Sequence, residues 1–385
     1  MRKVKFFAMT ATLLSLMFFL STGTIFAQSA KSEPIKIGLI VAFSGPQAEL
    51  GALIKGAVEM RLQESDFTVA GKKIQLIVED GAEDTSISLE KAKKLVEMDK
   101  VKIIIGPTTS SIALALAPYL FQNKVIDISM LHHPPQIAKM GVIVFPGTLE
   151  STGVITGWYA WEKGYKKMTT IAADYVAGKQ YVGGAREGFK SKGGTLLKAQ
   201  WAPIGTLDFG PYLSAIDKEA DVLNVWTTSG DLLRLVKQIK EFAIKIPFLL
   251  SPASTLRPDN LKELGKDILG VGGGAEYTSM IDNPVNKKFV ANYKAKFGKR
   301  PDKNSAAGYA AASIALAGLT ATQGEITYDK LRKAIIGLKI EVPHGPLSFT
   351  ADGIAITNRY LCEARMIDGG EYDWVPIKTY SNVHP

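Results

Sequence analysis

The sequence contains one cysteine, Cys362, and only four histidines. A single cysteine cannot form an intramolecular disulfide, and it cannot build a thiolate zinc site. Enzyme signatures are missing too: there is no Gly-x-Ser-x-Gly elbow, no His-Glu-x-x-His, no Cys-x-x-Cys and no Gly-x-x-x-x-Gly-Lys phosphate loop. The sequence therefore predicts a protein that is not an enzyme and that uses no cofactor and no metal.

Long hydrophobic runs are missing except near the start of the chain. Arg2, Lys3 and Lys5 precede the apolar run 8–20, and small residues follow it as far as Ala27. That run is shorter than the roughly 20 residues needed to span a bilayer, and its flanks are those of a cleavable signal peptide. We therefore predict that residues 1–27 are an export signal. No cysteine lies near the cut, so we expect no lipid anchor.

A strong charge bias is missing as well. Without the signal peptide the formal net charge falls from +9 to +6, and the surplus lies in scattered lysine pairs. Scattered surface lysines on an exported protein do not indicate a nucleic-acid partner. The hydrophobic content of 46% is that of a globular protein. A mature chain of about 355 residues exceeds one ordinary core, so two domains are expected.

The chain alternates strand-like and helix-like segments. The first series has expected strands at 35–43, 73–79, 102–105, 125–128 and 142–145, and expected helices at 47–64, 86–98 and 110–121. After Gly147 a second series repeats the pattern to residue 276, three helices follow within 284–337, and short strands close the chain. Repeated strand–helix units predict an α/β protein with parallel sheets covered on both faces. The late strands suggest that the chain re-enters an earlier sheet.

Polar groups cluster where the expected strands end, which is where open α/β sheets bind small ligands. Residues 35–46 read as a buried strand that ends in a loop at Ser44. Gly106-Pro-Thr-Thr-Ser-Ser111 follows another strand and opens a helix, so Thr109 and Ser110 predict an anion site, with plain helix capping as the alternative. The carboxylates of Glu83-Asp84 are interpreted as a solvated loop.

Histidines and aromatic residues stand at other strand ends. His132 and His133 can donate to a carboxylate, bind a metal or stack on the following prolines, and adjacent histidines on an extended segment point opposite ways, which disfavours joint metal binding. Which of the two faces a ligand stays open. Tyr175 and Trp226 begin or precede helices of the second series. Ligand stacking and core or hinge packing both fit them.

Several short segments, in this order, resemble the leucine/isoleucine/valine-binding type of periplasmic binding protein, the receptors of branched-chain amino acid ABC transporters. They are Ser44-Gly-Pro46 with Gly51, Val78-Glu-Asp80, Ile105-Gly-Pro107 with Ser110, Asp174-Tyr175 with Gly178, Phe297-Gly-Lys-Arg-Pro301, Gly308-Tyr309, and Gly345-Pro-Leu-Ser-Phe349 with Asp352-Gly353. The resemblance covers nearly all of the mature chain.

The resemblance implies the type I fold of periplasmic binding proteins: two doubly wound, Rossmann-like lobes joined by three crossings, with the solute bound between them. Lobe I is expected at 34–148 and 278–345, and lobe II at 149–277 and 346–385. The resemblance also implies a periplasmic monomer that closes on its solute and docks on an ABC permease with its ATPase at the inner membrane.

The resemblance also implies site residues. Ser110 matches the serine that holds the ligand's carboxylate, and Leu131 and His133 fall at two further carboxylate contacts. Where the family has an aromatic wall, two tyrosines and an acidic partner for the ligand's ammonium, this chain has Leu50, Ala177, Thr228 and Ala253. The full predicted ligand-binding set is Ser44, Leu50, Thr109, Ser110, Leu131, His133, Tyr175, Ala177, Trp226, Thr228, Ala253, Glu276 and Asn304.

The alanine at position 253 bears on the ligand, because a buried ammonium without a counter-charge costs several kcal/mol. We therefore expect a carboxylate without an α-amino group, aromatic or aliphatic, against Trp226 or Tyr175. The alternative is an amino acid whose ammonium is met by Glu276 or Asp174 from another direction. A ligand-sensing receptor of the same fold, and a secreted hydrolase or lyase, are the alternatives to a transport role.

Overall fold

The protein is described here from a computed structural model, which describes residues 33–131 and 133–383. The predicted signal peptide, His132 and the last two residues lie outside the described residues. The described residues from Pro34 onward form one compact unit. No helix in the described part of the chain is both long enough and apolar enough to cross a membrane.

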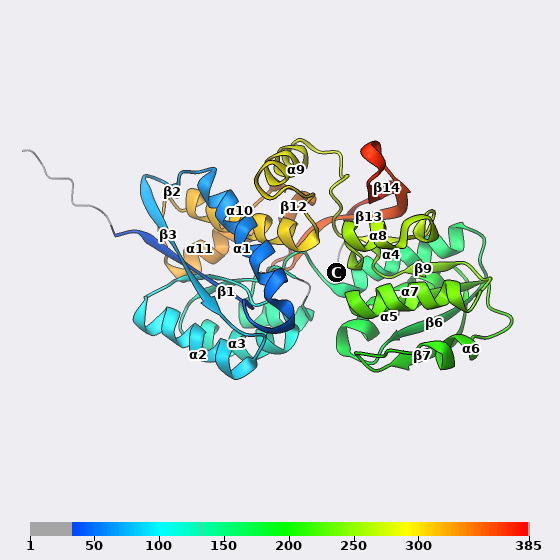
Figure 1. The fold of residues 1–385 in the computed structure, drawn as a ribbon. Helices are drawn as coiled ribbons and strands as arrows, with labels where there is room; N and C mark the ends of the chain where they lie inside the picture. The colour runs from blue at the N-terminus through cyan, green and yellow to red at the C-terminus, as the bar shows by residue number, and fades with distance from the viewer. Residues whose placement is uncertain (1–32, 132, 384–385) are drawn as a thin grey trace, which may run out of the picture. The chain divides into compact units, whose positions relative to one another are not determined.

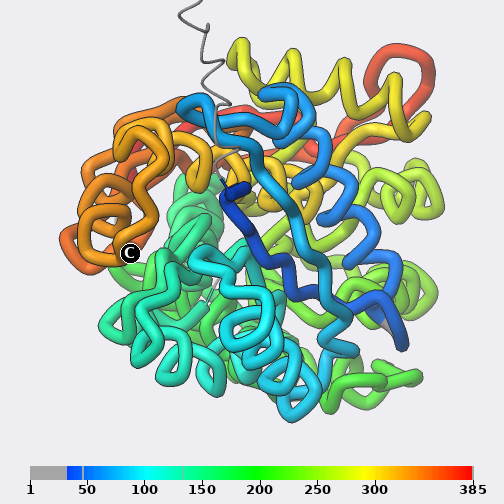
Figure 2. Tube along the Cα trace, turned by 90° about the vertical axis from the view of Figure 1, so that its left-hand side faces the viewer, coloured from blue at the N-terminus to red at the C-terminus, as the bar shows by residue number. Residues whose placement is uncertain are grey.

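The first sheet has five strands in the order β2-β3-β1-β4-β5. Its strands β1, β2 and β3 are labelled in Figure 1. The strands are β1 (Ile35–Val41), β2 (Thr68–Val69), β3 (Lys72–Asp80), β4 (Ile103–Ile105) and β5 (Ile126–Ile128). β1 runs parallel to both β3 and β4, and Leu39 lies beside Val78 on one side and Ile105 on the other. β1 and β3 also run side by side in the trace of Figure 2. The carboxyl ends of these strands therefore share one edge.

Helices connect these strands. They are α1 (Ala48–Gln63) after the short η1 (Gly45–Gln47), α2 (Thr85–Lys93) continuing into the π-helix η2 (Lys94–Met98), and α3 (Ser110–Gln122), with η3 (Pro135–Met140) after β5. The expected strand at 142–145 is not a strand. Ile143 and Val144 instead form isolated bridges with Ile128 and Ile354.

The second sheet has nine strands, with β14 (Tyr372–Val383) paired to β13 (Ala355–Met366) beside the order β11-β12-β13-β10-β9-β8-β6-β7. The others are β6 (Lys167–Ala173), β7 (Thr195–Ala202), β8 (Val222–Trp226), β9 (Phe248–Leu250), β10 (Gly272–Ala275), β11 (Ile340–Val342) and β12 (Gly345–Phe349). Strands β10, β9, β8, β6 and β7 are parallel, and β13 joins β10 antiparallel. The late strands thus re-enter this sheet, as predicted.

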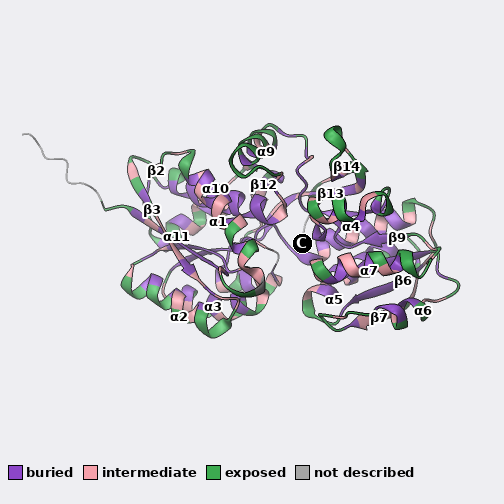
Figure 3. Ribbon diagram, in the orientation of Figure 1, coloured by how far each residue is buried: buried purple, intermediate pink, exposed green. Residues whose placement is uncertain are grey.

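Further helices cover the sheets. They are α4 (Leu149–Glu162), α5 (Val176–Ser191), α6 (Gly210–Ser214), α7 (Ser229–Glu241), α8 (Pro258–Leu264), α9 (Pro284–Phe297), α10 (Lys303–Ala321) and α11 (Tyr328–Ile336), with short turns η4 (Ala253–Thr255), η5 (Gly265–Ile268) and η6 (Asp368–Gly370). The strands are largely buried, whereas many helices present one exposed face (Figure 3). Burial on both sides explains why the central parallel strands β1, β4 and β9 are almost entirely apolar.

The prediction of two α/β lobes is confirmed, and three stretches of chain connect them. Phe145 precedes the first connection and Tyr277 begins the second, while β13 is itself the third: its Thr357 pairs with β12 and its Leu361 with β10. Leu347 and Ala355 pack in the core of the first sheet together with Phe349. These three residues, which lie beyond the predicted boundary at 345, therefore belong to strands of the second sheet but pack against the core of the first.

Candidate functional site

A cavity of about 530 Å³ lies where the carboxyl ends of the parallel strands of both sheets approach each other. Such a volume suits a small molecule. Both lobes contribute walls, and the lining residues are Gln47, Glu49, Leu50, Glu83, Thr108, Thr109, Ser110, Leu131, Leu149, Tyr175, Ala177, Tyr181, Trp226, Thr228, Ser229, Gly230, Thr255, Arg257, Asn260, Glu276, Lys303 and Asn304.

One end of the cavity has groups that can bind an anion. Helix α3 starts there at Ser110, with Thr109 as its extended N-cap, and the Thr109 side chain caps no backbone N–H. The Thr109 hydroxyl oxygen is buried and has no hydrogen-bond partner among the described residues. The first turn of a helix exposes unpaired N–H groups and the positive end of the helix dipole. Two hydroxyls and these N–H groups therefore face the same end of the cavity.

His133 lies behind this end and does not line the cavity. It is fully buried, and its Nδ1 atom is 3.3 Å from the Ser110 hydroxyl oxygen. Burial lowers the pKa of His133 to about 4, and the Pro107 carbonyl opposes this shift only in part. The imidazole is thus neutral at neutral pH, and its contact with the Ser110 hydroxyl helps to position that side chain. The sequence left open whether His132 or His133 faces the ligand, and His132 is outside the described residues.

Aromatic side chains form one wall of the cavity. The rings of Tyr175 and Trp226 are stacked, with centroids 6.3 Å apart and an angle of 24° between their planes. Trp226 also packs against Tyr181, with ring centroids 5.2 Å apart. The Trp226 indole N–H donates to the Thr255 hydroxyl at 2.8 Å, which fixes the ring. Only Tyr175 remains substantially exposed, at 38%. This wall can stack on a flat apolar ligand.

The acidic residue predicted as an alternative ammonium partner, Glu276, lines the cavity but already has partners. Its carboxylate lies 3.3 Å from the Lys303 ammonium and accepts a hydrogen bond of 2.7 Å from Ser254. Ala253 is buried and does not line the cavity. Asp174, the other alternative, is half exposed and paired with Lys179 at 2.7 Å, away from the cavity lining.

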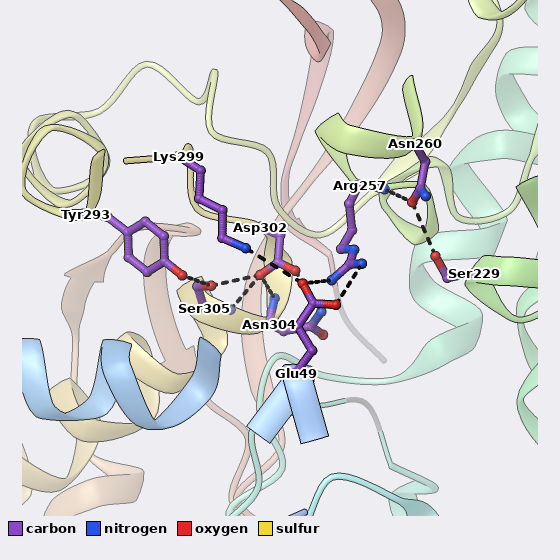
Figure 4. A network of polar contacts seen from close by, with 9 residues as sticks. All are labelled: Glu49, Ser229, Arg257, Asn260, Tyr293, Lys299, Asp302, Asn304 and Ser305. Carbon is purple, nitrogen blue, oxygen red and sulfur yellow. Dashed lines mark hydrogen bonds and ion pairs between the residues drawn. The ribbon is translucent and has the colours of Figure 1, made fainter. Parts of the chain in front are cut away.

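An ion pair crosses the cavity mouth. Glu49, in the first turn of α1, lies 3.2 Å from Arg257, which directly precedes α8 of the other lobe (Figure 4). Lys299 approaches the same carboxylate at 3.7 Å. Hydrogen bonding to Arg257 is the main reason why the pKa of Glu49 is lowered. Arg257 is itself held by a backbone hydrogen bond to Asn260, which also contacts Ser229 in Figure 4.

Ten of the thirteen predicted site residues line this cavity: Leu50, Thr109, Ser110, Leu131, Tyr175, Ala177, Trp226, Thr228, Glu276 and Asn304. The exceptions are His133 and Ala253, both buried, and Ser44, which is exposed at the start of η1. Sequence reasoning missed Glu83, Arg257 and Lys303. Glu83 was interpreted as part of a solvated loop, but it is half-buried in the cavity wall. No local pattern around Arg257 or Lys303 marked them.

Comparison with known proteins agrees with this geometry. A family model described as periplasmic binding protein matches residues 34–371. "Leu/Ile/Val-binding protein homolog 6" of Brucella melitensis is 26% identical over 371 residues, 94% of this chain and 95% of that protein.

Solved structures are similar too. A solute-binding protein of an ABC transporter from Rhodopseudomonas palustris, in complex with 3,4-dihydroxybenzoic acid, is 30% identical with a TM-score of 0.84, covering 91% of this chain and 98% of that chain. An ABC transporter substrate-binding protein from Sphaerobacter thermophilus is 28% identical with a TM-score of 0.87, covering 91% and 99%.

Proposed function

This chain belongs to the periplasmic binding protein family, and from that premise we propose that it captures a small carboxylic acid without an α-amino group for an ABC transporter. The ligand's carboxylate binds at the start of α3, against Ser110 and Thr109. Its apolar body, preferably an aromatic ring, packs on the wall of Tyr175 and Trp226. The dihydroxybenzoate complex of the Rhodopseudomonas palustris protein supports a ligand of this chemical class.

The observation that carries this proposal is the charge distribution of the cavity. The anion end has an unpaired buried hydroxyl and a helix N-terminus. Elsewhere in the cavity wall, Glu276 is paired with Lys303. An α-ammonium group would have to displace Lys303 to gain this partner, and the displaced ammonium of Lys303 would then lose its own counter-charge in a largely buried position. A simple carboxylate needs no such exchange.

Calorimetric titration tests this proposal. We expect purified protein to bind benzoate with a dissociation constant of about 10 µM or tighter, and leucine at least about 100-fold more weakly. Leucine binding as tight as that of the aromatic acid would contradict the proposal, because the cavity would then have to supply a partner for the ammonium.

We also propose where this capture takes place. Residues 1–27 direct export to the periplasm and are removed there, which is the location implied by the family. The protein then acts as a monomer that closes over its ligand and delivers it to a membrane permease with its ATPase. Its role is binding and delivery without chemical change, so incubated ligand should be recovered intact.

A further inference from the structure

The Glu83 carboxylate lies in the cavity wall and belongs neither to the anion end nor to the ion pairs described above. It is half-buried and lines the cavity, and no hydrogen bond or ion pair joins it to any other residue in the described part of the chain. Glu49 and Glu276, the other acidic residues of the wall, are both paired with cations. Glu83 thus differs from them in offering free acceptor oxygens to whatever occupies the cavity.

The loop that carries Glu83 is held firmly on both sides. Asp80 accepts hydrogen bonds of 2.8 Å from the backbone N–H groups of Phe43 and Ala82, and Asp84 caps α2 by accepting from Ile87 at 2.8 Å. Glu83 itself has a φ of 55°, a region that non-glycine residues rarely adopt. These contacts fix the backbone at Glu83 while leaving its side chain free, so the carboxylate is presented to the cavity from a rigid support.

The sheet order sets the distance between Glu83 and the anion end. Ser110 follows β4 and Glu83 follows β3, and β1 lies between these two strands. Neighbouring strands are about 4.8 Å apart, so the two loops leave the sheet about 10 Å from each other. An α-ammonium nitrogen lies only about 2.5 Å from the carboxylate carbon of an amino acid. Glu83 is therefore placed for a group at the far end of the ligand.

Across the cavity Glu83 faces the aromatic wall. The Glu83 carboxylate is close enough to the Tyr175 phenol to raise the pKa of that phenol, although burial is the larger cause. Burial also raises the pKa of Glu83. A ring stacked on Tyr175 would thus have its edge near the Glu83 oxygens. A partly desolvated carboxylate accepts strongly from a hydroxyl, and such bonds are among the stronger hydrogen bonds in proteins.

We propose that Glu83 selects aromatic acids that carry a ring hydroxyl opposite their carboxylate, such as 4-hydroxybenzoate, over unsubstituted benzoate. This inference rests on the proposed function. The hydroxyl donates to Glu83 while the carboxylate binds at the start of α3. Benzoate leaves Glu83 without a partner and excludes water from it, so the preference comes both from the bond gained and from the desolvation avoided.

The test compares benzoate and 4-hydroxybenzoate by calorimetry on wild type and on Glu83→Ala. We expect wild type to bind the hydroxylated acid about 10- to 100-fold more tightly. Glu83→Ala should reduce this preference to about twofold or less, by weakening 4-hydroxybenzoate while leaving benzoate unchanged or slightly tighter. Glu90→Ala, which removes an exposed carboxylate from α2 in the same lobe, is the matched control and should keep the full preference.

The outcomes separate the two proposals. Benzoate binding without a preference for the hydroxyl, or a Glu83→Ala variant that weakens both acids equally, overturns the role of Glu83 alone. Failure of the wild type to bind any of these acids overturns the proposed function, and with it this inference. Unchanged benzoate affinity in Glu83→Ala also shows that the variant is folded, so a loss confined to the hydroxylated acid is not a folding effect.

Discussion

The Nδ1 atom of His133 lies 3.3 Å from the hydroxyl oxygen of Ser110, so the serine expected to hold the ligand is itself positioned by a buried imidazole. A neutral imidazole carries one N–H, on either Nδ1 or Nε2, and this choice determines whether the Ser110 hydroxyl accepts from or donates to the ring. If Nδ1 donates to Ser110, the serine's own proton is free for an anion. We expect ligand binding to favour this arrangement.

Ser110→Ala should weaken binding of the carboxylate by about 1–3 kcal/mol, because a charge-assisted hydrogen bond is lost. Calorimetric titration with benzoate measures the change. Ser111→Ala is the matched control: Ser111 is the next residue of α3, is exposed and does not line the cavity, so its affinity should stay at the wild-type value. Equal affinities for wild type and Ser110→Ala would place the anion elsewhere.

His133→Leu should weaken the same binding by a smaller factor, about 3- to 10-fold, because it removes only the support of the serine. The decisive measurement is a double-mutant cycle. In a Ser110→Ala background the His133→Leu change should have little further effect on affinity, since the group that His133 positions is already absent. Full additivity of the two losses would show that His133 acts on binding independently of Ser110.

Arg257→Ala should weaken binding about two- to fivefold at low salt, because the Glu49–Arg257 pair joins the two lobes on either side of the ligand. Glu49 is largely exposed, so the effect should nearly vanish at about 0.5 M salt. Lys237→Ala, which breaks an exposed pair with Glu263 within one lobe, is the control and should leave affinity unchanged. An Arg257 effect that persists at high salt would contradict a screened ion pair.

The anion end could be predicted from sequence because its signal is local. Thr109 and Ser110 stand between a buried strand and a helix, and that order alone fixes both their position at the edge of the sheet and the N–H groups beside them. The aromatic wall of Tyr175 and Trp226 was predicted on the same grounds, although stacking and core packing stayed open. In the structure Trp226 is buried in a core cluster and also lines the cavity, a position that fits both interpretations.

The charged half of the site could not be predicted, because it depends on pairs that are distant in sequence. Lys303 meets Glu276, and Arg257 meets Glu49 more than 200 residues away, only after the chain has crossed between the lobes. Glu83 was interpreted as a solvated loop residue because the residues that face it across the cavity, such as Tyr175, are distant in sequence. The lobe boundary near residue 345 stays a prediction, because β13 is continuous across both lobes and no turn marks the crossing.

A pH-dependent loss of stability should arise at His344, which lies where the three connections meet. Its ring packs on Phe145 at 4.9 Å and Tyr277 at 5.1 Å, and its carbonyl accepts from Tyr360 at 2.8 Å. Burial lowers the pKa of His344 to about 3, with Arg359 lowering it further and Glu276 opposing. Between the folded value and about 6.5 the unfolded chain binds more protons, so stability falls as the pH falls through this window.

At about pH 5 this single histidine should cost the folded state about 2 kcal/mol relative to a pH well above 6.5. His344→Leu removes the titrating group and its two unpaired ring nitrogens. The drop in unfolding free energy between about pH 7.5 and pH 5, measured by urea denaturation, should therefore be smaller in this variant by about the same amount. An identical drop in both proteins would mean that other groups cause the acid sensitivity.

Lys303→Met should change which ligands the protein accepts. The Lys303 ammonium lies 3.3 Å from Glu276, a nearly fully buried carboxylate in the cavity wall, and is the cation that allows Glu276 to remain there. Without it the Glu276 carboxylate keeps its hydrogen bond from Ser254 but loses this ion pair, so more of its negative charge acts on the ligand. Repulsion should weaken benzoate binding at least about 10-fold, whereas an amino acid now finds a partner for its ammonium and should gain affinity.

Titration of Lys303→Met with benzoate and with leucine measures this exchange. Lys299→Met is the matched control, since Lys299 lies near the cavity mouth and its partner there, at 3.7 Å, is the largely exposed Glu49. The loss of a partner for Glu276 should also lower the unfolding free energy by about 1–3 kcal/mol, less than for a fully buried pair because Lys303 is partly exposed. If Lys303→Met loses affinity for both ligands in parallel, the lysine contributes to folding of the site and not to the rejection of α-amino groups.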